Sequence, residues 1–322
     1  MKYRRLGKSG LKVSNICLGT MQFGWSASKS DSFAILNYAL ELGCNFIDTA
    51  DIYSSWYAGN QGGESEEIIG QWLLRKDARR QGLVIATKVR GKMGPGPNDE
   101  GLSRGHIMDS VEASLKRLRT DYIDLYQVHW PDEETPLEET LRALDDLIRS
   151  GKVRYIGCSN YPAWLLMRSL WISDVKRLAR FESLQPHYSY VHRAEFEREL
   201  RPVCIDQQIG VIPYSPLGGG FLTGKYRRDG KRPESVRVDG VKKRYMNDKG
   251  FTALEALERV GQEHGSTIAQ TAIAWMLADE VISSAIIGAN TLSQLADTMK
   301  GADVLLSSEE KVALDNITNW TN

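Results

Sequence analysis

Short apolar segments alternate with longer segments of helical periodicity along most of the chain. Eight short runs rich in Val, Ile and Leu predict strands, which cover residues 16–19, 45–49, 83–88, 123–129, 153–159, 184–186, 210–214 and 284–288. Between them, apolar residues recur every three to four positions and predict helices near residues 31–42, 64–76, 104–119, 136–150, 162–176, 194–206, 267–278 and 291–300. Residues 3–13 predict a small hairpin that turns at Lys8, Ser9 and Gly10.

Alternation of strands and helices is typical of a parallel sheet. The predicted strands are continuous apolar runs, which indicates that both faces of the sheet are buried. An open doubly wound sheet and a closed barrel both satisfy this pattern. Eight βα units in 322 residues fit the barrel, and the Gly-x-Gly-x-x-Gly motif of an open dinucleotide-binding sheet occurs nowhere. The sequence therefore predicts an α/β fold, a (β/α)8 TIM barrel with an N-terminal β-hairpin, as one domain over residues 1–322.

One segment, residues 225–249, interrupts this rhythm. It is polar, contains Gly and Pro, and holds ten basic residues against four acidic ones. It is too long for an ordinary βα loop, and such long loops are usually functional or disordered. Because it follows the seventh predicted strand, we expect it on the side of the barrel where barrel enzymes keep their active sites.

Charge and cysteine content narrow the classes of function. Lys plus Arg and Asp plus Glu both number 41, so the formal net charge is zero. Nucleic-acid and membrane-surface proteins need a basic excess, so we expect neither nucleic acid nor membrane as a partner. The cysteines are far apart and form no Cys-x-x-Cys pair, which is typical of buried thiols in a reducing compartment and predicts a cytoplasmic protein. The five histidines show no ligand spacing, so no metal is expected, and the sequence does not indicate an oligomeric state.

The ends of the predicted strands carry residues suited to proton transfer. In a barrel, the chemistry lies at the C-terminal ends of the strands, where Asp48, Lys88 and His129 fall; Tyr53 follows Asp48 by five residues. A buried lysine needs a partner, which Asp48 provides. A lysine beside a phenol favours the phenolate, so we expect the pKa of Tyr53 to be lowered from about 10. Tyr53 could then donate a proton to a carbonyl oxygen that His129 orients.

Several segments, taken together, resemble the aldo-keto reductase family from Lys2 to about Leu306. The matching motifs occur in the family's order: YRRLG at 3–7, GT at 19–20, NFIDTA at 45–50 with Tyr53, GESE at 63–66, ATK at 86–88, DLYQVHW at 124–130, GKVRYIGCSN at 151–160 and YSPLGGGFLTGKY at 214–226. The resemblance implies an oxidoreductase that interconverts a carbonyl (aldehyde or ketone) and an alcohol by hydride transfer with NAD(P)(H). It implies Tyr53 as the general acid, tuned by Lys88 and Asp48, with His129 orienting the carbonyl.

The resemblance also implies a site for the cofactor at the strand ends. Its expected residues are Gly19, Thr20, Met21, Asp48, Ser159, Asn160, Gln185, Tyr214, Ser215, Pro216, Leu217, Gly219, Lys225, Gly288, Asn290 and Gln294. Among them, Ser159, Asn160 and Gln185 would hydrogen-bond the nicotinamide carboxamide, and Tyr214 would stack on the ring. The pyrophosphate would be lined by Ser215, Leu217, Gly219 and Lys225, because glycine there permits close approach of the backbone.

One departure from the family pattern bears on cofactor choice. After the last strand, the family usually carries an Arg or Lys that pairs with the 2′-phosphate of NADPH. Residues 286–299 hold no basic residue here, and Asn290 and Gln294 occupy the region instead. Neutral amides lack the charge-assisted fork that makes arginine selective for phosphate, although the basic segment 225–249 could supply the charge. We therefore expect NADP(H) to be modestly preferred and NAD(H) to be used as well.

The resemblance implies a small-molecule carbonyl compound or alcohol as the substrate. The loop at residues 54–63 is longer than the compact family version. With Trp25, Trp56 and Trp130, it could place aromatic surface around the substrate carbonyl. Aromatic walls suit apolar rings and also stack on sugars, so they do not decide the substrate.

Other classes of function stay open at this point. The regulatory β subunits of potassium channels resemble the same barrel and bind the same cofactor, so a cofactor-binding regulatory or sensor protein is the alternative to an enzyme. A barrel hydrolase or lyase without a dinucleotide is a third class. Phosphoryl transfer is disfavoured: residues 219–225 read Gly-x-x-x-x-Gly-Lys, but residue 226 is Tyr and cannot supply the Mg²⁺-binding hydroxyl of a P-loop.

Overall fold

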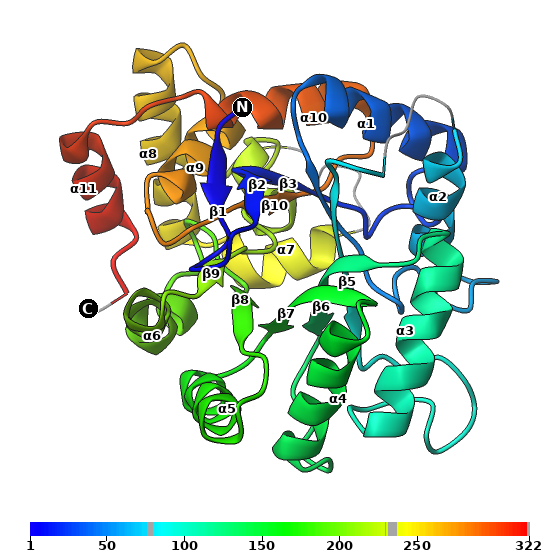
Figure 1. The fold of residues 1–322 in the computed structure, drawn as a ribbon. Helices are drawn as coiled ribbons and strands as arrows, with labels where there is room; N and C mark the ends of the chain where they lie inside the picture. Colours follow the sequence, from blue (N-terminus) through cyan, green and yellow to red (C-terminus); the bar gives the residue numbers. More distant parts are fainter. Residues whose placement is uncertain (76–79, 229, 231–236, 321–322) are drawn as a thin grey trace.

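Eight parallel strands form the centre of the molecule (Figure 1), in a computed structural model that describes residues 1–75, 80–228, 230 and 237–320. They are β3 (Ile16–Gly19), β4 (Phe46–Asp48), β5 (Val84–Val89), β6 (Ile123–Val128), β7 (Val153–Ser159), β8 (Phe181–Gln185), β9 (Gly210–Val211) and β10 (Ala285–Ile287). The strands pair in the order β10-β3-β4-β5-β6-β7-β8-β9. Backbone bonds of 2.8 and 3.0 Å, from Ser283 N to Val211 O and from Ile286 N to Pro213 O, join the two ends of this order. The predicted (β/α)8 barrel is confirmed.

The predicted N-terminal hairpin is also confirmed, and it lies against the barrel. Strands β1 (Tyr3–Arg5) and β2 (Lys12–Ser14) pair antiparallel, with Arg4 opposite Val13. Leu6 and Val13 are fully buried in a small apolar cluster with side chains from the barrel interior, such as Phe46. The Arg4 guanidinium donates to the carbonyl oxygens of Ile282 at 2.6 Å and Leu277 at 2.7 Å. The hairpin is therefore held to the segment that leads into β10.

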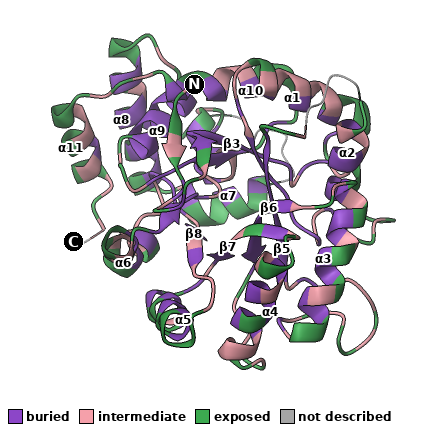
Figure 2. Cartoon of the chain, viewed as in Figure 1, coloured by how far each residue is buried: buried purple, intermediate pink, exposed green. Residues whose placement is uncertain are grey.

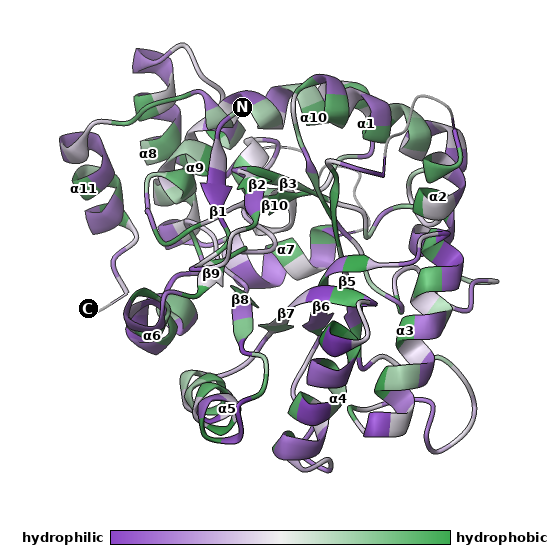
Figure 3. Cartoon of the chain, in the orientation of Figure 1, coloured by the Kyte–Doolittle hydropathy of each residue, from purple (hydrophilic) through white to green (hydrophobic). Residues whose placement is uncertain are grey.

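Helices surround the strands: α1 (Lys29–Glu41), α2 (Glu64–Leu73), α3 (Arg104–Leu118), α4 (Leu137–Arg149), α5 (Ala163–Lys176), α6 (Arg201–Gln207), α9 (Ile268–Leu277) and α10 (Leu292–Met299). Figure 2 shows buried strands and helices that are buried along one side, and Figure 3 shows hydrophobic and hydrophilic residues alternating along α3 and α4. In α4, Leu141, Leu144 and Leu147 are buried, whereas Glu138 and Arg142 form an ion pair on the outer face. Within the described ranges, no helix is both long and apolar enough to cross a membrane.

Helices α7 (Val238–Tyr245), α8 (Asp248–Glu263) and α11 (Ser308–Ile317) were not predicted. Helix α8 had a detectable signal, because Phe251, Leu254, Leu257 and Val260 recur every three residues and are all buried. The segment 225–249 is therefore not simply a loop, since it contains α7 and the start of α8. Its residues 229 and 231–236 lie outside the described part of the chain.

Other predicted bounds need correction where the local geometry is irregular. The predicted strand at 210–214 is only Gly210–Val211, because Pro213 has no N–H to donate to the sheet. Tyr214 still makes an isolated bridge to His187. The predicted helix at 194–206 is a π-helical turn, Phe196–Leu200, followed by α6. Helix α2 ends at Leu73, and residue 76, where its prediction ended, lies outside the described part.

We predict that Gly70→Ala destabilises the fold, because α2 crosses the end of α3 with no room for a side chain. A Cβ at residue 70 would overlap the carbonyl oxygen of Arg117, and backbone cannot move aside as a flexible side chain can. Overpacking of this kind costs about 1–3 kcal/mol. Gly105→Ala is the matched control: nothing lies within 4 Å of its Cβ, so the free energy of unfolding should stay constant or rise by up to about 1 kcal/mol. Urea unfolding curves that coincide for the two variants would contradict this packing argument.

Candidate active site

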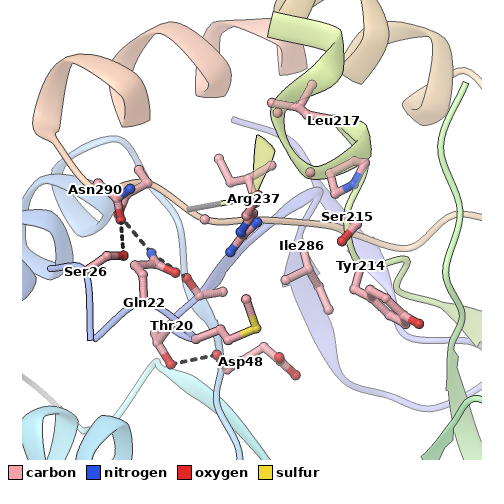
Figure 4. Close-up of a pocket in the computed structure, with 18 of the residues that line it drawn as sticks. Thr20, Gln22, Ser26, Asp48, Tyr214, Ser215, Leu217, Arg237, Ile286 and Asn290 are labelled. Carbon is pink, nitrogen blue, oxygen red and sulfur yellow. Dashed lines mark hydrogen bonds between the residues drawn. The ribbon is translucent and has the colours of Figure 1, made fainter. Parts of the chain in front are cut away.

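A cavity of about 620 Å³ opens at the carboxyl ends of the strands. Every residue of the sequence-predicted site except Lys88 lines it, namely Gly19, Thr20, Met21, Trp25, Asp48, Tyr53, Trp56, His129, Trp130, Ser159, Asn160, Gln185, Tyr214, Ser215, Pro216, Leu217, Gly219, Lys225, Gly288, Asn290 and Gln294. Figure 4 shows part of this lining, with side chains from opposite sides of the barrel mouth facing one space. Lys88 is fully buried and contacts Tyr53 from below the cavity surface.

The ammonium group of Lys88 connects three groups near the cavity floor. Its Nζ lies 2.5 Å from Asp48 Oδ1, 2.8 Å from the carbonyl oxygen of Thr49 and 2.8 Å from the Tyr53 hydroxyl. An ammonium has three donors, so all of them have partners here. Lys88 comes from β5 and Asp48 from the neighbouring β4, while Tyr53 returns from the loop after β4. The structure therefore brings together the three residues that the sequence placed at separate positions.

Two glutamine amides hold the second oxygen of Asp48. Gln185 Nε2 donates to Asp48 Oδ2 at 2.9 Å, and Gln127 Nε2 donates to the same oxygen at 3.1 Å. The sequence prediction included Gln185 but missed Gln127. A signal was present: Leu125 faces the barrel interior, and strand residues two apart share a face, so Gln127 also faces inward. The buried carboxylate thus has hydrogen-bond donors on both oxygens, which keeps its charge tolerable.

The pKa of Tyr53 differs from the sequence prediction. Burial raises this pKa and Lys88 lowers it, and because burial dominates, the value rises from 10.0 to about 12. The prediction of a lowered pKa is therefore wrong. Sequence alone showed the neighbouring charge but not the depth at which the phenol lies. The phenol stays protonated at neutral pH, as a proton donor must. Burial alone would lower the pKa of Lys88, but Asp48 and Tyr53 raise it to about 12, so the ammonium stays charged.

His129 lies beside the phenol in its neutral form. Its ring centroid is 5.8 Å from that of Tyr53, and it stacks on Trp130 at 3.7 Å. Burial, with help from the charges of Lys88 and Arg90, lowers the pKa of His129 well below its ordinary value. A neutral imidazole can donate one N–H hydrogen bond without adding a second cation next to Lys88.

A chain of hydrogen bonds orders the opposite side of the cavity. Asn160 Nδ2 donates to the carbonyl oxygen of His129 at 2.9 Å and to Ser159 Oγ at 3.1 Å. The Tyr214 hydroxyl donates to Asn160 Oδ1 at 2.9 Å. Asn160 and Ser215 both adopt left-handed φ values, 59° and 56°, which turn the chain sharply after β7 and after Tyr214. These bonds fix the Tyr214 ring as part of the wall.

Two histidine rings lie behind Tyr214. The His187 ring is nearly parallel to that of Tyr214 at a centroid distance of 5.2 Å, and His192 stacks on His187 at 4.0 Å. Burial and the neighbouring His192 lower the pKa of His187 to about 4, so it is neutral at pH 7. The Tyr214 ring is therefore supported on its far side by a flat, uncharged surface.

The segment after Tyr214 surrounds the cavity with glycine backbone. Gly219 and Gly220 line the cavity and have φ values of 67° and 95°, a region that only glycine adopts without strain. Lys225 also lines it, and its Nζ lies 3.5 Å from the position that a Cβ of Gly220 would occupy. Glycine backbone next to an ammonium is suited to binding phosphate oxygens.

The basic segment contributes Arg237 to the same cavity. Arg237 stands at the start of α7, and Figure 4 shows its side chain extending into the cavity that Ser215 and Asn290 also line. Asn290 Oδ1 accepts from Ser26 Oγ at 3.0 Å, and Asn290 N donates to Gln294 Oε1 at 2.9 Å. Sequence reasoning pointed to the segment but not to this residue, because contacts across the barrel cannot be seen in a linear pattern.

Other lining residues were missed entirely. They are Gln22, Ser26, Ile52, Gly220, Thr223, Ala269, Ile286, Ile287, Ala289, Asp297 and Thr298. Asp297 and Thr298 follow Gln294 by three and four residues on α10, so helical spacing was a signal that could have found them. Gln22 donates to the carbonyl oxygens of Gly19 at 3.1 Å and Ala289 at 2.9 Å, and so ties the ends of β3 and β10 together.

Aromatic side chains form the rim next to Tyr53. Trp56 meets Trp25 edge-on at 5.6 Å and lies 6.3 Å from the Tyr53 ring. Trp56 is 48% exposed and Trp130 is 37% exposed, so both present ring surface to solvent at the mouth. This rim favours contact with apolar or ring-shaped molecules.

The arrangement is suited to proton transfer next to a site for a flat ring and phosphates. A protonated phenol and a neutral imidazole lie at one end, and an aromatic wall, glycine backbone, Lys225 and Arg237 line the rest. Within the described ranges, no group of three or more His, Cys, Asp or Glu side chains could hold a metal ion.

Comparison with known proteins gives the family. The aldo/keto reductase family model matches residues 15–319. The uncharacterized oxidoreductase YrpG of Bacillus subtilis is 39% identical over 322 residues, covering 98% of this chain and 96% of its own. A probable voltage-gated potassium channel subunit beta of Arabidopsis thaliana is 38% identical, covering 95% and 92%. The versiconal hemiacetal acetate reductase of Aspergillus parasiticus is 34% identical, covering 96% and 95%. The chain belongs to the aldo/keto reductase family.

We predict that Lys88→Met raises the pKa of Tyr53 further, because the phenolate loses its neighbouring cation. The free energy of unfolding should fall by about 3–5 kcal/mol, since Asp48 is left buried without its ionic partner. Lys152→Met is the matched control: Lys152 pairs with Glu112 at the surface, so about 1 kcal/mol or less is expected. Urea unfolding and a pH–rate profile measure the two effects. A profile that overlays the wild type would show that Lys88 and Tyr53 are not coupled.

Proposed function

We propose that this protein is an NAD(P)(H)-dependent oxidoreductase that interconverts an aldehyde or ketone and the corresponding alcohol, with Tyr53 as the general acid. The observation that supports this most is the contact of Lys88 Nζ with both Asp48 and the Tyr53 hydroxyl, at 2.5 and 2.8 Å, beneath a large cavity. A buried cation in this position stabilises a phenolate, and a phenolate is what remains after Tyr53 gives up its proton.

The cavity residues fit a nicotinamide dinucleotide. Gln185 Nε2 is committed to Asp48 and Gln127, which leaves Gln185 Oε1 to accept from a carboxamide N–H. Ser159 Oγ donates to the Gln185 carbonyl oxygen at 2.8 Å and accepts from Asn160 Nδ2 at 3.1 Å, so one lone pair remains available as an acceptor. Tyr214 offers a flat wall for the ring, and the glycines at 219–220 let phosphates approach the backbone.

Each residue then has one role in the reduction. The bound dinucleotide supplies the hydride that adds to the carbonyl carbon. Tyr53 donates its phenolic proton to the carbonyl oxygen as negative charge develops there, and His129 donates a hydrogen bond to the same oxygen. Lys88 stabilises the phenolate that is left, and Asp48 holds Lys88 in place. One hydride and one proton together convert the carbonyl to the alcohol, and the oxidation runs through the same groups in reverse.

We propose that NADP(H) is modestly preferred and that NAD(H) is also used. Arg237 lines the cavity from the basic segment and can pair with a 2′-phosphate, whereas Asn290 and Gln294 contribute only neutral amides. A single charged contact of this kind supports preference for the phosphate without excluding the ribose hydroxyl of NAD(H).

A cofactor-binding regulatory or sensor protein is the second candidate. It is favoured by the 38% identity to a probable voltage-gated potassium channel subunit beta of Arabidopsis thaliana. Turnover separates the two: an enzyme cycles repeatedly with its substrate, and a sensor oxidises its bound cofactor slowly and once. The assay uses aromatic aldehydes, short aliphatic aldehydes, keto-sugars and keto-steroids with both cofactors. It would also identify the substrate class.

We predict that Tyr53→Phe lowers the turnover of any active carbonyl substrate by about 10²–10⁴-fold, the usual contribution of general acid catalysis. Cofactor binding, measured by fluorescence quenching, should stay within a few-fold, because the aromatic ring remains. Tyr57→Phe is the control, since Tyr57 lies in the same loop but is 49% exposed and does not line the cavity. A Tyr53→Phe variant that keeps more than half of the wild-type activity would show that the acid is another group.

We predict that Arg237→Ala lowers the ratio of kcat/KM for NADPH over NADH by one to two orders of magnitude. A charge-assisted hydrogen bond is worth roughly 1.5–3 kcal/mol, and each 1.4 kcal/mol is about tenfold. Asn290→Arg should raise the same ratio. Arg227→Ala is the control, because Arg227 lies in the same basic segment but pairs with Glu258 away from the cavity.

Two results would contradict this account of cofactor choice. An unchanged ratio in Arg237→Ala would mean that this arginine does not face the 2′-phosphate. A wild-type preference above about a thousandfold, which exceeds two such contacts at the low end of their range, would mean that the preference is not modest.

A further inference from the structure

Gln127 has an unusual position for a glutamine. It lies on β6, is completely buried, and does not line the cavity. Both ends of its amide are used: Nε2 donates to Asp48 Oδ2 at 3.1 Å, and Oε1 accepts from Gln185 Nε2 at 3.2 Å. Burying an amide costs free energy unless its hydrogen bonds compensate for the lost solvation. A fully bonded buried amide therefore indicates a task that an apolar side chain could not perform.

The surrounding strands fix this amide in place. Gln127 pairs with Lys88 on β5 and with Gly157 on β7, and Gly157 pairs with Ser183 on β8. A Cβ at residue 157 would overlap Ser183 Oγ and lie 3.4 Å from Gln127 Cγ. Glycine at this position therefore leaves room for Ser183 Oγ beside Gln127. The side chains of Gln127, Gln185 and Asp48 form one hydrogen-bonded layer across the barrel interior.

The layer joins the cavity wall to the phenol through continuous hydrogen bonds. Gln185 lines the cavity, its Nε2 donates to Asp48 Oδ2, Asp48 Oδ1 accepts from Lys88, and Lys88 contacts the Tyr53 hydroxyl. Donors on Oδ2 compete with Lys88 for the carboxylate charge. Within the Gln185 amide the effect is cooperative, because a hydrogen bond accepted by Oε1 polarises the amide and strengthens donation from Nε2.

We propose that Gln127 is a positioning residue which, together with Gln185, couples cofactor binding at the cavity wall to the proton donor Tyr53. The proposal rests on the proposed function. A carboxamide N–H that donates to Gln185 Oε1 polarises the Gln185 amide and strengthens its donation to Asp48. Asp48 raises the pKa of Tyr53 and Lys88 lowers it, so a better-neutralised Asp48 makes the phenol the stronger acid when the cofactor is present. Gln127 holds Asp48 Oδ2 and the Gln185 amide in the positions that this effect requires.

Kinetics test the role of the side chain. Gln127→Met keeps the volume but removes one hydrogen bond to a buried charge. We expect turnover to fall about tenfold and the pH at which reduction declines to rise by about one unit, with the Kd for NADP⁺ within threefold of wild type. Tyr126→Phe is the control on the same strand: its hydroxyl has no partner in the described part of the chain and faces away from the barrel interior, so its profile should overlay the wild type. Gln127→Asn, whose amide is too short to reach Asp48, should shift the profile as Gln127→Met does.

Spectroscopy on the whole protein tests the coupling without turnover. In protein labelled with ¹⁵N-glutamine, the side-chain resonance that disappears in Gln127→Asn belongs to Gln127. Adding NADP⁺ should shift this resonance although Gln127 does not line the cavity, and the shift should vanish in Gln185→Met. A Gln127 resonance that NADP⁺ leaves unmoved, or an unshifted pH profile in Gln127→Met, overturns the coupling.

The proposed function is tested separately in the same assay. Loss of turnover in Tyr53→Phe with an unshifted profile in Gln127→Met overturns the coupling alone. Full turnover in Tyr53→Phe overturns the assignment of the acid, and with it the part of the proposed function that rests on Tyr53.

Discussion

The buried ammonium of Lys88 is the charge on which the rest of the site depends. Burying an unpaired cation at this depth would cost more free energy than the folded state can compensate, so the barrel must supply a partner for each N–H of the ammonium. Asp48, Thr49 and Tyr53 provide them from β4 and its loop. The carboxylate that pairs with Lys88 then needs donors of its own, which come from β6 and β8. The charge of Lys88 thereby determines which side chains three other strands and one loop place in the barrel interior.

The barrel makes this arrangement possible because residues on neighbouring strands, although far apart in sequence, lie at the same height along the barrel axis. Phe46, Val84 and Leu125 fill the interior near the hairpin, and polar side chains replace them toward the carboxyl ends. The apolar end provides stability, and the polar end provides chemistry. The two ends are not fully separate, however. Tyr53 lies deep enough that burial raises its pKa by more than the neighbouring Lys88 lowers it.

Much of this could be predicted from the sequence, because strands buried on both faces leave continuous apolar runs. The bounds of β3 and β7 follow directly from Ile16–Gly19 and Val153–Ser159. The strand at 210–214 was overextended because Pro213 fits an apolar pattern but lacks an N–H. The motifs located the catalytic candidates. Arg237 depends on contacts across the barrel that no linear spacing reveals, whereas Gln127 was missed although its spacing from Leu125 places it on the inward face of β6. Depth of burial was also hidden, which is why the direction of the Tyr53 pKa shift was wrong.

Closure of the barrel has a consequence for how the chain folds during synthesis. Strand β3 pairs with β10, so Ile16 cannot pair until Ala285 has been synthesised. The hydrogen bonds of Arg4 likewise cannot form until Leu277 and Ile282 have been synthesised. At 5–20 residues per second, a ribosome needs on the order of 10–60 s to make the intervening chain. During that interval the edge of β3 that later pairs with β10 has no strand beside it, and an unpaired edge invites association with other chains. The nascent protein is therefore most prone to aggregation before its last βα unit emerges, and chaperones that shield strand edges should matter most then.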